Sequence, residues 1–154
     1  MIVLDLPDET ATAKLAARIS PLAGPGDVIA LRGDLGTGKT SFARAFIRAR
    51  SGREEEVPSP TFTLVQVYAE DATAIWHFDL YRLRSHQEAW ELGIEDAFSD
   101  GISLIEWPER LGALLPPRRL EIALAFGQRP ESRLVSLDPG AGWSARMAAI
   151  TRDA

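Results

Sequence analysis

The chain has 154 residues, of which 45% are apolar and 25% charged, with a formal net charge of −5 and no cysteine. These figures predict a single globular domain over residues 1–154 and exclude disulfide, thiolate and zinc–thiolate chemistry. The acidic balance argues against a protein that holds nucleic acid by itself through a broad basic surface. The sequence shows neither an apolar run long enough to cross a membrane nor a signal peptide, so we expect a cytoplasmic protein without membrane contact.

The first elements of the chain are predicted to be a strand, a helix and a second strand. Ile2–Leu6 is a short apolar run that Pro7 ends. Asp8 or Thr10 can cap the helix that follows. A Gly-Pro-Gly turn at 24–26 then leads into a β-branched apolar strand over 27–32.

The segment after this second strand fits the phosphate-binding pattern G-x-x-x-x-G-K-[ST] at every fixed position. Its glycines permit positive φ and a close approach to a ligand, and the N–H groups of such a loop form a concave anion site. Lys39 adds a positive charge for the outer phosphates, and the Thr40 hydroxyl can bind Mg²⁺. The predicted nucleotide-binding residues here are Gly33, Asp34, Leu35, Gly36, Thr37, Gly38, Lys39, Thr40 and Ser41.

An amphipathic helix should follow the loop and end near Ser51, because apolar side chains recur at three- and four-residue spacing. The residues that carry this spacing are Phe42, Ala45, Phe46 and Ala49. A buried strand before the loop and a helix after it are the context in which such a loop binds phosphate. Arginines at 44, 48, 50 and 53, and a pair at 118 and 119, are read as solvated surface charge or as a contact with RNA or a partner.

The segment Val57–Thr63 contains two prolines and several hydroxyl side chains. In P-loop proteins, the loop after the first helix can carry a threonine or serine that senses the γ-phosphate and the metal. Thr61 is the candidate for that role. The alternative interpretation is a strand entry stiffened by Pro58 and Pro60.

Two strands, over 63–68 and 74–81, are separated by a short connection and predict an antiparallel hairpin. Alternation places His77 and Asp79 on one face of the second strand. An acid in an apolar strand needs a partner. Asp79 can approach the metal, a bound water or Lys39, or it can form an ion pair with Arg82.

The two histidines, His77 and His86, have no metal-ligating partner in the sequence and are interpreted as structural. Ser85 and Glu88 form a capping box for a short helix. An interrupted second turn then precedes the next strand.

An apolar strand over 101–107 contains Glu106 near its C-terminal end, which is the form of a Walker B element. P-loop enzymes need a carboxylate there to hold Mg²⁺, directly or through water. Trp107 is open to three interpretations: a core anchor, a lid over the site or an interface residue. Pro108 should begin a short helix.

The remainder of the chain predicts a hairpin of strands over 119–126 and 132–137, followed by a terminal helix over 143–152. The complete pattern indicates an α/β protein: a single-domain P-loop NTPase fold with a mixed parallel and antiparallel sheet flanked by helices.

Four motifs together resemble the TsaE family, small bacterial P-loop ATPases that help to form N6-threonylcarbamoyladenosine in tRNA. The motifs are Gly-Asp-Leu-Gly-Thr-Gly-Lys-Thr (33–40), Ser-Pro-Thr-Phe-Thr-Leu (59–64), His-Phe-Asp-Leu-Tyr-Arg (77–82) and Glu-Trp-Pro-Glu (106–109). The resemblance covers residues 6–137 and leaves the turn and helix of 138–154 without a counterpart.

The resemblance implies ATP and Mg²⁺ as ligands, slow ATP hydrolysis, and a partner complex made of the transferase and its inactive paralogue. It implies that hydrolysis resets this complex, with tRNA contacted through the partners. Thr40 and Glu106 match the Mg²⁺ positions of the family, and Asp79 and Trp107 match positions important for its ATPase or partner function. Two further positions, Glu9 and Thr10, match the start of a helix near the nucleotide. A late arginine near the nucleotide is common in the family, and Arg129 and Arg133 are both candidates.

We therefore expect a weak ATPase that a partner complex stimulates, because no arginine finger is evident in the sequence. Lys39 would stabilise phosphate charge, Asp79 or Glu106 would orient water or the Mg²⁺ ion held near Thr40, and Thr61 would act as sensor. The alternatives are a small-molecule kinase and a nucleotide-binding regulator that does not hydrolyse ATP.

Overall fold

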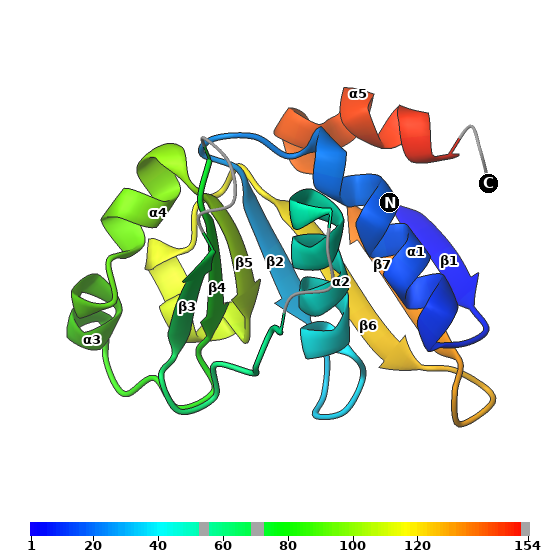
Figure 1. Cartoon of the computed structure of the whole chain (residues 1–154), viewed down its shortest axis with the longest axis horizontal. Coiled ribbons are helices and arrows are strands. Elements are labelled where there is room, and N and C mark those ends of the chain that lie inside the picture. Colours follow the sequence, from blue (N-terminus) through cyan, green and yellow to red (C-terminus); the bar gives the residue numbers. More distant parts are fainter. Residues whose placement is uncertain (53–55, 69–72, 152–154) are drawn as a thin grey trace.

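The computed structural model describes residues 1–52, 56–68 and 73–151, which surround one seven-stranded sheet (Figure 1). The strand order is β1-β7-β6-β2-β5-β4-β3. The central strands β6, β2, β5 and β4 are parallel, whereas β1–β7, β7–β6 and β4–β3 pair antiparallel. This arrangement confirms the predicted mixed sheet. The strands are β1 (Ile2–Leu6), β2 (Val28–Arg32), β3 (Val65–Tyr68), β4 (Ile75–Asp79), β5 (Ile102–Glu106), β6 (Leu120–Phe126) and β7 (Arg133–Asp138).

The buried apolar side chains form two cores, each made of residues from strands and helices. The larger core gathers α1, α2 and α5, and the smaller one gathers α3, α4 and η2. Figure 1 shows α1 and α2 side by side against the sheet, with α3 and α4 beyond β3 and β4. None of the helices in the described ranges has the length and apolar character that a bilayer-spanning segment requires. The helices are α1 (Glu9–Ile19), η1 (Ser20–Leu22), α2 (Lys39–Ser51), α3 (His86–Glu91), α4 (Ile94–Asp100), η2 (Pro108–Leu114) and α5 (Gly140–Thr151).

The predicted apolar face of α2 is only partly right. Phe42 and Phe46 are fully buried, but Ala49 is exposed and the other buried apolar positions are Ala43 and Ile47. The reason is that α2 packs against both the sheet and α1, so its buried stripe is wider and rotated relative to the spacing that the sequence suggested.

Helix ends show further differences from the sequence prediction. Asp8, not Thr10, caps α1, with Oδ1 accepting the Ala11 N–H at 2.9 Å. The Ser85 hydroxyl caps α3 as expected, but Glu88 accepts the N–H of Arg84 rather than that of Ser85. The helix begun by Pro108 is a 3₁₀ helix with a break at 112, and α5 begins at 140 instead of 143. Three features of the sequence prediction lie outside the described residues: Arg53, most of the connection over 69–73, and the end of the last helix at 152.

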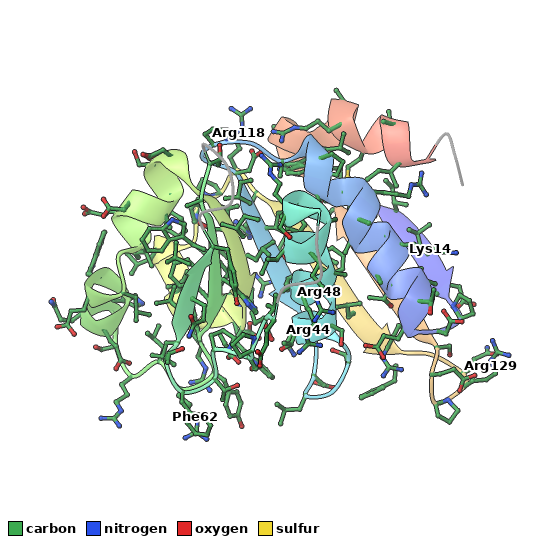
Figure 2. The ribbon with its side chains drawn as sticks, in the orientation of Figure 1. Lys14, Arg44, Arg48, Phe62, Arg118 and Arg129 are labelled. Atoms are coloured by element: carbon green, nitrogen blue, oxygen red, sulfur yellow. The ribbon has the colours of Figure 1, made fainter. Side chains whose placement is uncertain are left out.

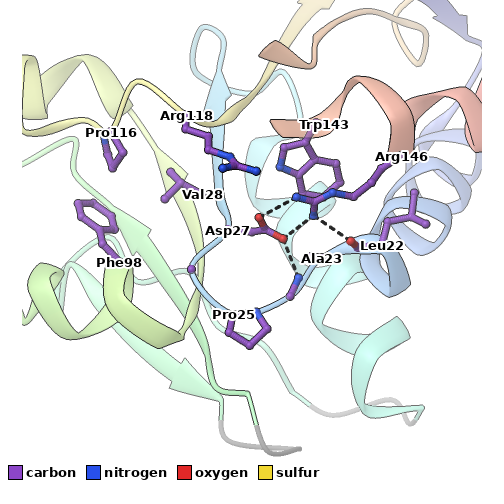
Figure 3. Close-up of a pocket in the computed structure, with 12 residues that line it drawn as sticks. Leu22, Ala23, Pro25, Asp27, Val28, Phe98, Pro116, Arg118, Trp143 and Arg146 are labelled. Atoms are coloured by element: carbon purple, nitrogen blue, oxygen red, sulfur yellow. Dashed lines mark hydrogen bonds and ion pairs between the residues drawn. The ribbon is translucent and has the colours of Figure 1, made fainter. Parts of the chain in front are cut away.

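The C-terminal helix is attached beside the start of β2. Arg146 donates to both carboxylate oxygens of Asp27, at 2.5 and 3.1 Å, and to the carbonyl of Leu22 at 3.0 Å. Its guanidinium also lies 4.1 Å from the ring centre of Trp143 (Figure 3). A cavity of about 650 Å³ lies beside this cluster. It lies at the start of β2, opposite to the end from which the phosphate-binding loop leaves.

Candidate functional site

The phosphate-binding loop joins the C-terminal end of β2 to the N-terminus of α2. Gly33, Gly36 and Gly38 have φ values of 149°, 82° and 106°. A Cβ at Gly33 would also lie 2.5 Å from the carbonyl oxygen of Leu124, so this position requires glycine for space as well as for conformation. Because α2 begins at Lys39, the N–H groups of its first turn are directed toward the loop, as in helix-terminal anion sites.

Lys39 lies across the loop and is only 5% exposed. Its Nζ donates to the carbonyls of Gly33, at 2.5 Å, and Asp34, at 3.0 Å, and lies 4.1 Å from the ring centre of Trp107. Burial lowers the pKa of Lys39, whereas the carboxylates of Glu106 and Asp79 act to raise it. The two carbonyl contacts hold the amino group of Lys39 against the loop.

Glu106 ends β5 and is 3% exposed. The Thr40 hydroxyl lies 2.9 Å from Oε1 and 3.0 Å from Oε2 of Glu106, and the Nε2 atom of His77 lies 2.6 Å from Oε2. The hydroxyl and the carboxylate that the sequence assigned to Mg²⁺ are thus in direct contact.

Asp79 ends β4 in register with Glu106 on β5. Its Oδ2 accepts a hydrogen bond from the Thr61 hydroxyl at 3.1 Å, and its Oδ1 accepts the Tyr81 N–H at 3.1 Å. The guanidinium of Arg82 lies instead over the ring of Phe62, 4.7 Å from its centre. Asp79 therefore connects β4 to the segment that carries the candidate sensor threonine.

These side chains share one cavity of about 270 Å³. A lysine, four hydroxyl side chains and two carboxylates converge there from different parts of the chain. Oxygen donors of this kind suit Mg²⁺, and the lysine and loop amides suit phosphate groups, so the residues fit a magnesium–nucleotide complex. The lining residues are Leu35, Gly36, Gly38, Lys39, Thr40, Ser41, Ser59, Thr61, Asp79, Glu106 and Trp107.

A smaller cavity lies on the other side of the loop and involves Glu9, Thr12 and Arg133. Arg133 donates from Nε to the carbonyl of Thr37 at 2.9 Å and from Nη2 to that of Gly36 at 3.3 Å. Arg129 lies near Glu131 instead, in an exposed pair at 3.6 Å. Of the two late arginines, Arg133 is therefore the one that contacts the loop.

Two residues other than glycine adopt left-handed backbone conformations in the described ranges, and both adjoin the site. Leu64 has φ 67° and Trp107 has φ 60°. The carbonyl of Leu64 accepts the Asp79 N–H at 3.0 Å, and the Trp107 ring lies 5.0 Å from that of Tyr81. Such conformations cost about 1–3 kcal/mol and persist where the surroundings hold them.

The arginines that cluster in the sequence separate in space. Arg44 and Arg48 lie on the outer side of α2, along a groove shared with α1 (Figure 2). Arg50 instead donates to the carbonyls of residues 20 and 23. Arg118 lines the cavity at the start of β2, while Arg119 pairs with a carboxylate on β6. The described residues therefore do not bring these side chains into one basic patch.

Sequence reasoning missed three residues of this region: His77, Thr12 and Glu131. It treated His77 as isolated, although alternation had already placed it on the face of Asp79. Its partner Glu106 comes from a neighbouring strand, which local pattern does not reveal. Thr12 and Glu131 line the cavity beside the loop with Glu9, whereas Thr10 is not part of that lining.

The parallel central strands, the loop between β2 and α2, and the carboxylate at the end of β5 define a P-loop NTPase fold. The family model for "Threonylcarbamoyl adenosine biosynthesis protein TsaE" matches residues 6–134. The chain belongs to the TsaE family.

Curated relatives carry the same description. A "tRNA threonylcarbamoyladenosine biosynthesis protein TsaE" of Rickettsia felis is 43% identical over 122 residues, covering 79% of this chain and 71% of that protein. The protein of that name from Bacillus subtilis is 40% identical over 120 residues, covering 77% and 72%. The crystal structure of Bacillus subtilis YdiB superposes with a TM-score of 0.80 at 26% identity and covers 99% of this chain and 95% of that one.

Proposed function

We propose that this protein is a magnesium-dependent ATPase subunit that supports formation of N6-threonylcarbamoyladenosine in tRNA. The observation that carries the proposal is the convergence of Lys39, Thr40, Asp79 and Glu106 on one cavity at the phosphate-binding loop. The names of the relatives supply the pathway. Because the substrate of that pathway is tRNA, we assign the protein to the cytoplasm.

In this proposal the reaction is in-line attack of water on the γ-phosphorus of ATP, which releases ADP, inorganic phosphate and a proton. The loop amides and Lys39 bind the outer phosphates and stabilise the charge that develops on them. Mg²⁺, when bound, neutralises charge on these phosphates. Thr40 and Glu106 would hold the ion, with Asp79 as a further carboxylate that orients the ion or the water.

The segment from Ser59 to Leu64 is proposed to report on the γ-phosphate. The Thr61 hydroxyl bonds to Asp79 at 3.1 Å and lies 2.7 Å from the Ser59 hydroxyl, so both hydroxyls are available at the cavity. A hydroxyl that exchanges a protein partner for a phosphate or metal partner can couple nucleotide state to loop conformation.

We propose that the isolated subunit is a weak ATPase. No arginine lines the cavity that holds Lys39 and Glu106 in the described ranges, and Arg133 contacts the loop from its other side. An arginine finger typically contributes about 10³–10⁵ in turnover, so a site without one depends on a partner. The proposed partners are the threonylcarbamoyl transferase and its inactive paralogue, with tRNA contacted through them and Trp107 as the lid or partner residue.

The test is ATP turnover with and without the purified transferase pair and tRNA, together with the extent of tRNA modification. Wild-type protein should hydrolyse ATP slowly alone and at least about tenfold faster with the complex. Lys39→Ala and Glu106→Ala should lose both the turnover and the modification. Normal modification in both variants, without stimulation of the wild type, would overturn the proposal. Phosphoryl transfer to a metabolite would instead identify a kinase.

A further inference from the structure

His77 stands out among the buried polar groups because its one side-chain hydrogen-bond partner in the described part of the chain is a proposed metal ligand, Glu106. It lies on β4, is 0% exposed, and faces Glu106 across the pair of strands β4 and β5. The distance of 2.6 Å between Nε2 and Oε2 is that of a strong hydrogen bond between a nitrogen and a carboxylate. A carboxylate can only accept, so Nε2 carries the proton. Nδ1 is buried without a hydrogen-bond partner in the described part of the chain, so the contact with Glu106 is the one that orients the ring.

The two carboxylate oxygens of Glu106 have different hydrogen-bond partners. Thr40 Oγ1 lies 2.9 and 3.0 Å from Oε1 and Oε2, so its single hydrogen does not select one of them. His77 contacts Oε2 alone. The imidazole therefore restricts the rotation of the carboxylate and leaves Oε1 with Thr40 as its hydrogen-bond partner among the described residues, and both Thr40 and Glu106 line the cavity.

The strand pairing gives His77 the rigidity that this task requires. His77 pairs with Leu104 and Asp79 pairs with Glu106, so the imidazole reaches the carboxylate from a fixed position on the adjacent strand. Both backbones belong to the buried centre of the sheet. A glutamate side chain with three rotatable bonds loses conformational freedom when it is ordered. A donor on a rigid strand allows the fold to provide that ordering before a metal binds.

We propose that His77 is a positioning residue: its Nε2–H holds the Glu106 carboxylate beside Thr40 in the orientation that binds the metal of the nucleotide complex. This inference rests on the proposed function, in which Glu106 and Thr40 hold Mg²⁺. Partners that orient metal ligands typically contribute about 10–100-fold to metal affinity. His77 thus sets the affinity of the site without touching the metal or the nucleotide.

Two amides of different length test the role of the donor. His77→Gln places an amide N–H near the position of Nε2, whereas the His77→Asn amide is one methylene shorter and does not reach Glu106. Mn²⁺ affinity in the presence of ADP, measured by electron paramagnetic resonance, should weaken by less than about threefold for Gln and by more than about tenfold for Asn. ADP affinity in EDTA should stay within about twofold for both. Ser103→Ala is the control, because Ser103 is also fully buried on β5 and has no hydrogen-bond partner among the described residues.

Crystal structures without metal or nucleotide separate this inference from the proposed function. Glu106 should keep its contact with Thr40 in His77→Gln and leave it in His77→Asn. Equal metal affinity for the two variants, with Glu106 unmoved in both, would overturn the positioning role. If wild-type protein bound no Mn²⁺ with ADP, the proposed function would fail, while the crystal structures would still decide whether His77 orients Glu106.

Discussion

Asp79 and Glu106 pair in register at the C-terminal ends of two adjacent parallel strands, yet their carboxylates have different partners. Asp79 accepts from Thr61, in the segment after α2, while Glu106 accepts from Thr40, in the first turn of α2. The pair therefore joins the phosphate-binding helix and the candidate sensor segment at one edge of the sheet.

The first prediction concerns the Thr61 hydroxyl. Thr61→Val keeps the shape of the side chain and removes the hydrogen bond to Asp79. We expect ATP turnover to fall by at least about tenfold while ADP affinity changes by less than about threefold. The reason is that the proposed role of the Thr61 hydroxyl is to respond to the γ-phosphate, which ADP lacks. Single-turnover hydrolysis and ADP titration provide the measurement. Thr63→Val is the matched control, and an equal loss in both variants would contradict the sensor role.

The second prediction uses the contact between Trp107 and Lys39. Because the Nζ atom lies 4.1 Å from the ring centre, movement of Lys39 toward a phosphate should change the fluorescence of Trp107. Nucleotide titration should give a signal that Trp107→Phe abolishes. The exposed Trp90 offers the control, since Trp90→Phe should retain the full change. A signal retained in Trp107→Phe would show that the indole does not report on the site.

The third prediction distinguishes the two late arginines. Arg133 donates to the carbonyls of Gly36 and Thr37, whereas Arg129 is exposed and lies near Glu131. Arg133→Ala removes charge-assisted hydrogen bonds to the loop, each worth about 1.5–3 kcal/mol, so nucleotide affinity should fall by about tenfold or more. Arg129→Ala should leave it unchanged. Isothermal titration with ADP measures both, and reversal of the order would transfer the role to Arg129.

The fourth prediction concerns pH and Glu121. Burial acts to raise the pKa of Glu121, but hydrogen bonds from Arg32 and Arg119 outweigh it and bring the pKa below 4.5. A depressed carboxyl pKa stabilises the folded state above the unfolded pKa, and this stability is lost as pH falls through the folded pKa. The free energy of unfolding of the wild type should therefore exceed that of Glu121→Gln by about 1 kcal/mol at neutral pH. The difference is small because Glu121 is partly exposed and solvent screens its ion pairs.

Urea unfolding of both proteins measures this difference across pH. The difference in unfolding free energy should be constant near neutral pH and should shrink as pH falls from the ordinary glutamate pKa toward the lowered pKa of Glu121 in the folded state. If the difference in unfolding free energy between wild type and Glu121→Gln grew as the pH fell, the assigned ion pairs of Glu121 would be contradicted.

The fifth prediction concerns the attachment of α5. Arg146→Leu leaves the Asp27 carboxylate without its bidentate partner, so the free energy of unfolding should fall by about 1–3 kcal/mol. ADP affinity should not change, because the pair lies at the start of β2 rather than at the loop. Arg118→Ala is the control, since Arg118 lines the same cavity but is exposed. Chemical denaturation should show a lower free energy of unfolding for Arg146→Leu and an unchanged one for Arg118→Ala.

Much of this fold could be predicted because its signals are local. The glycines of the loop over 33–40 indicate a tight turn whose backbone can approach a ligand closely. The alternation in 74–81 assigns side chains to the two faces of a strand. Caps and breaks are also local, yet they were predicted less well. Asp8 and Thr10 both offered a suitable oxygen, and only the backbone geometry of the helix start selected Asp8.

The residue types and their order along the chain were thus determined by the sequence alone: a glycine-rich loop, a candidate sensor threonine and two carboxylates at strand ends. Only the tertiary structure decided which of these groups touch. Arg133 contacts the loop because β7 lies beside β6 and β6 beside β2, and His77 contacts Glu106 because β4 pairs with β5. Pairing between strands distant in sequence depends on how the whole chain packs. The contact between Glu106 and a histidine on the neighbouring strand is therefore a property of the folded sheet.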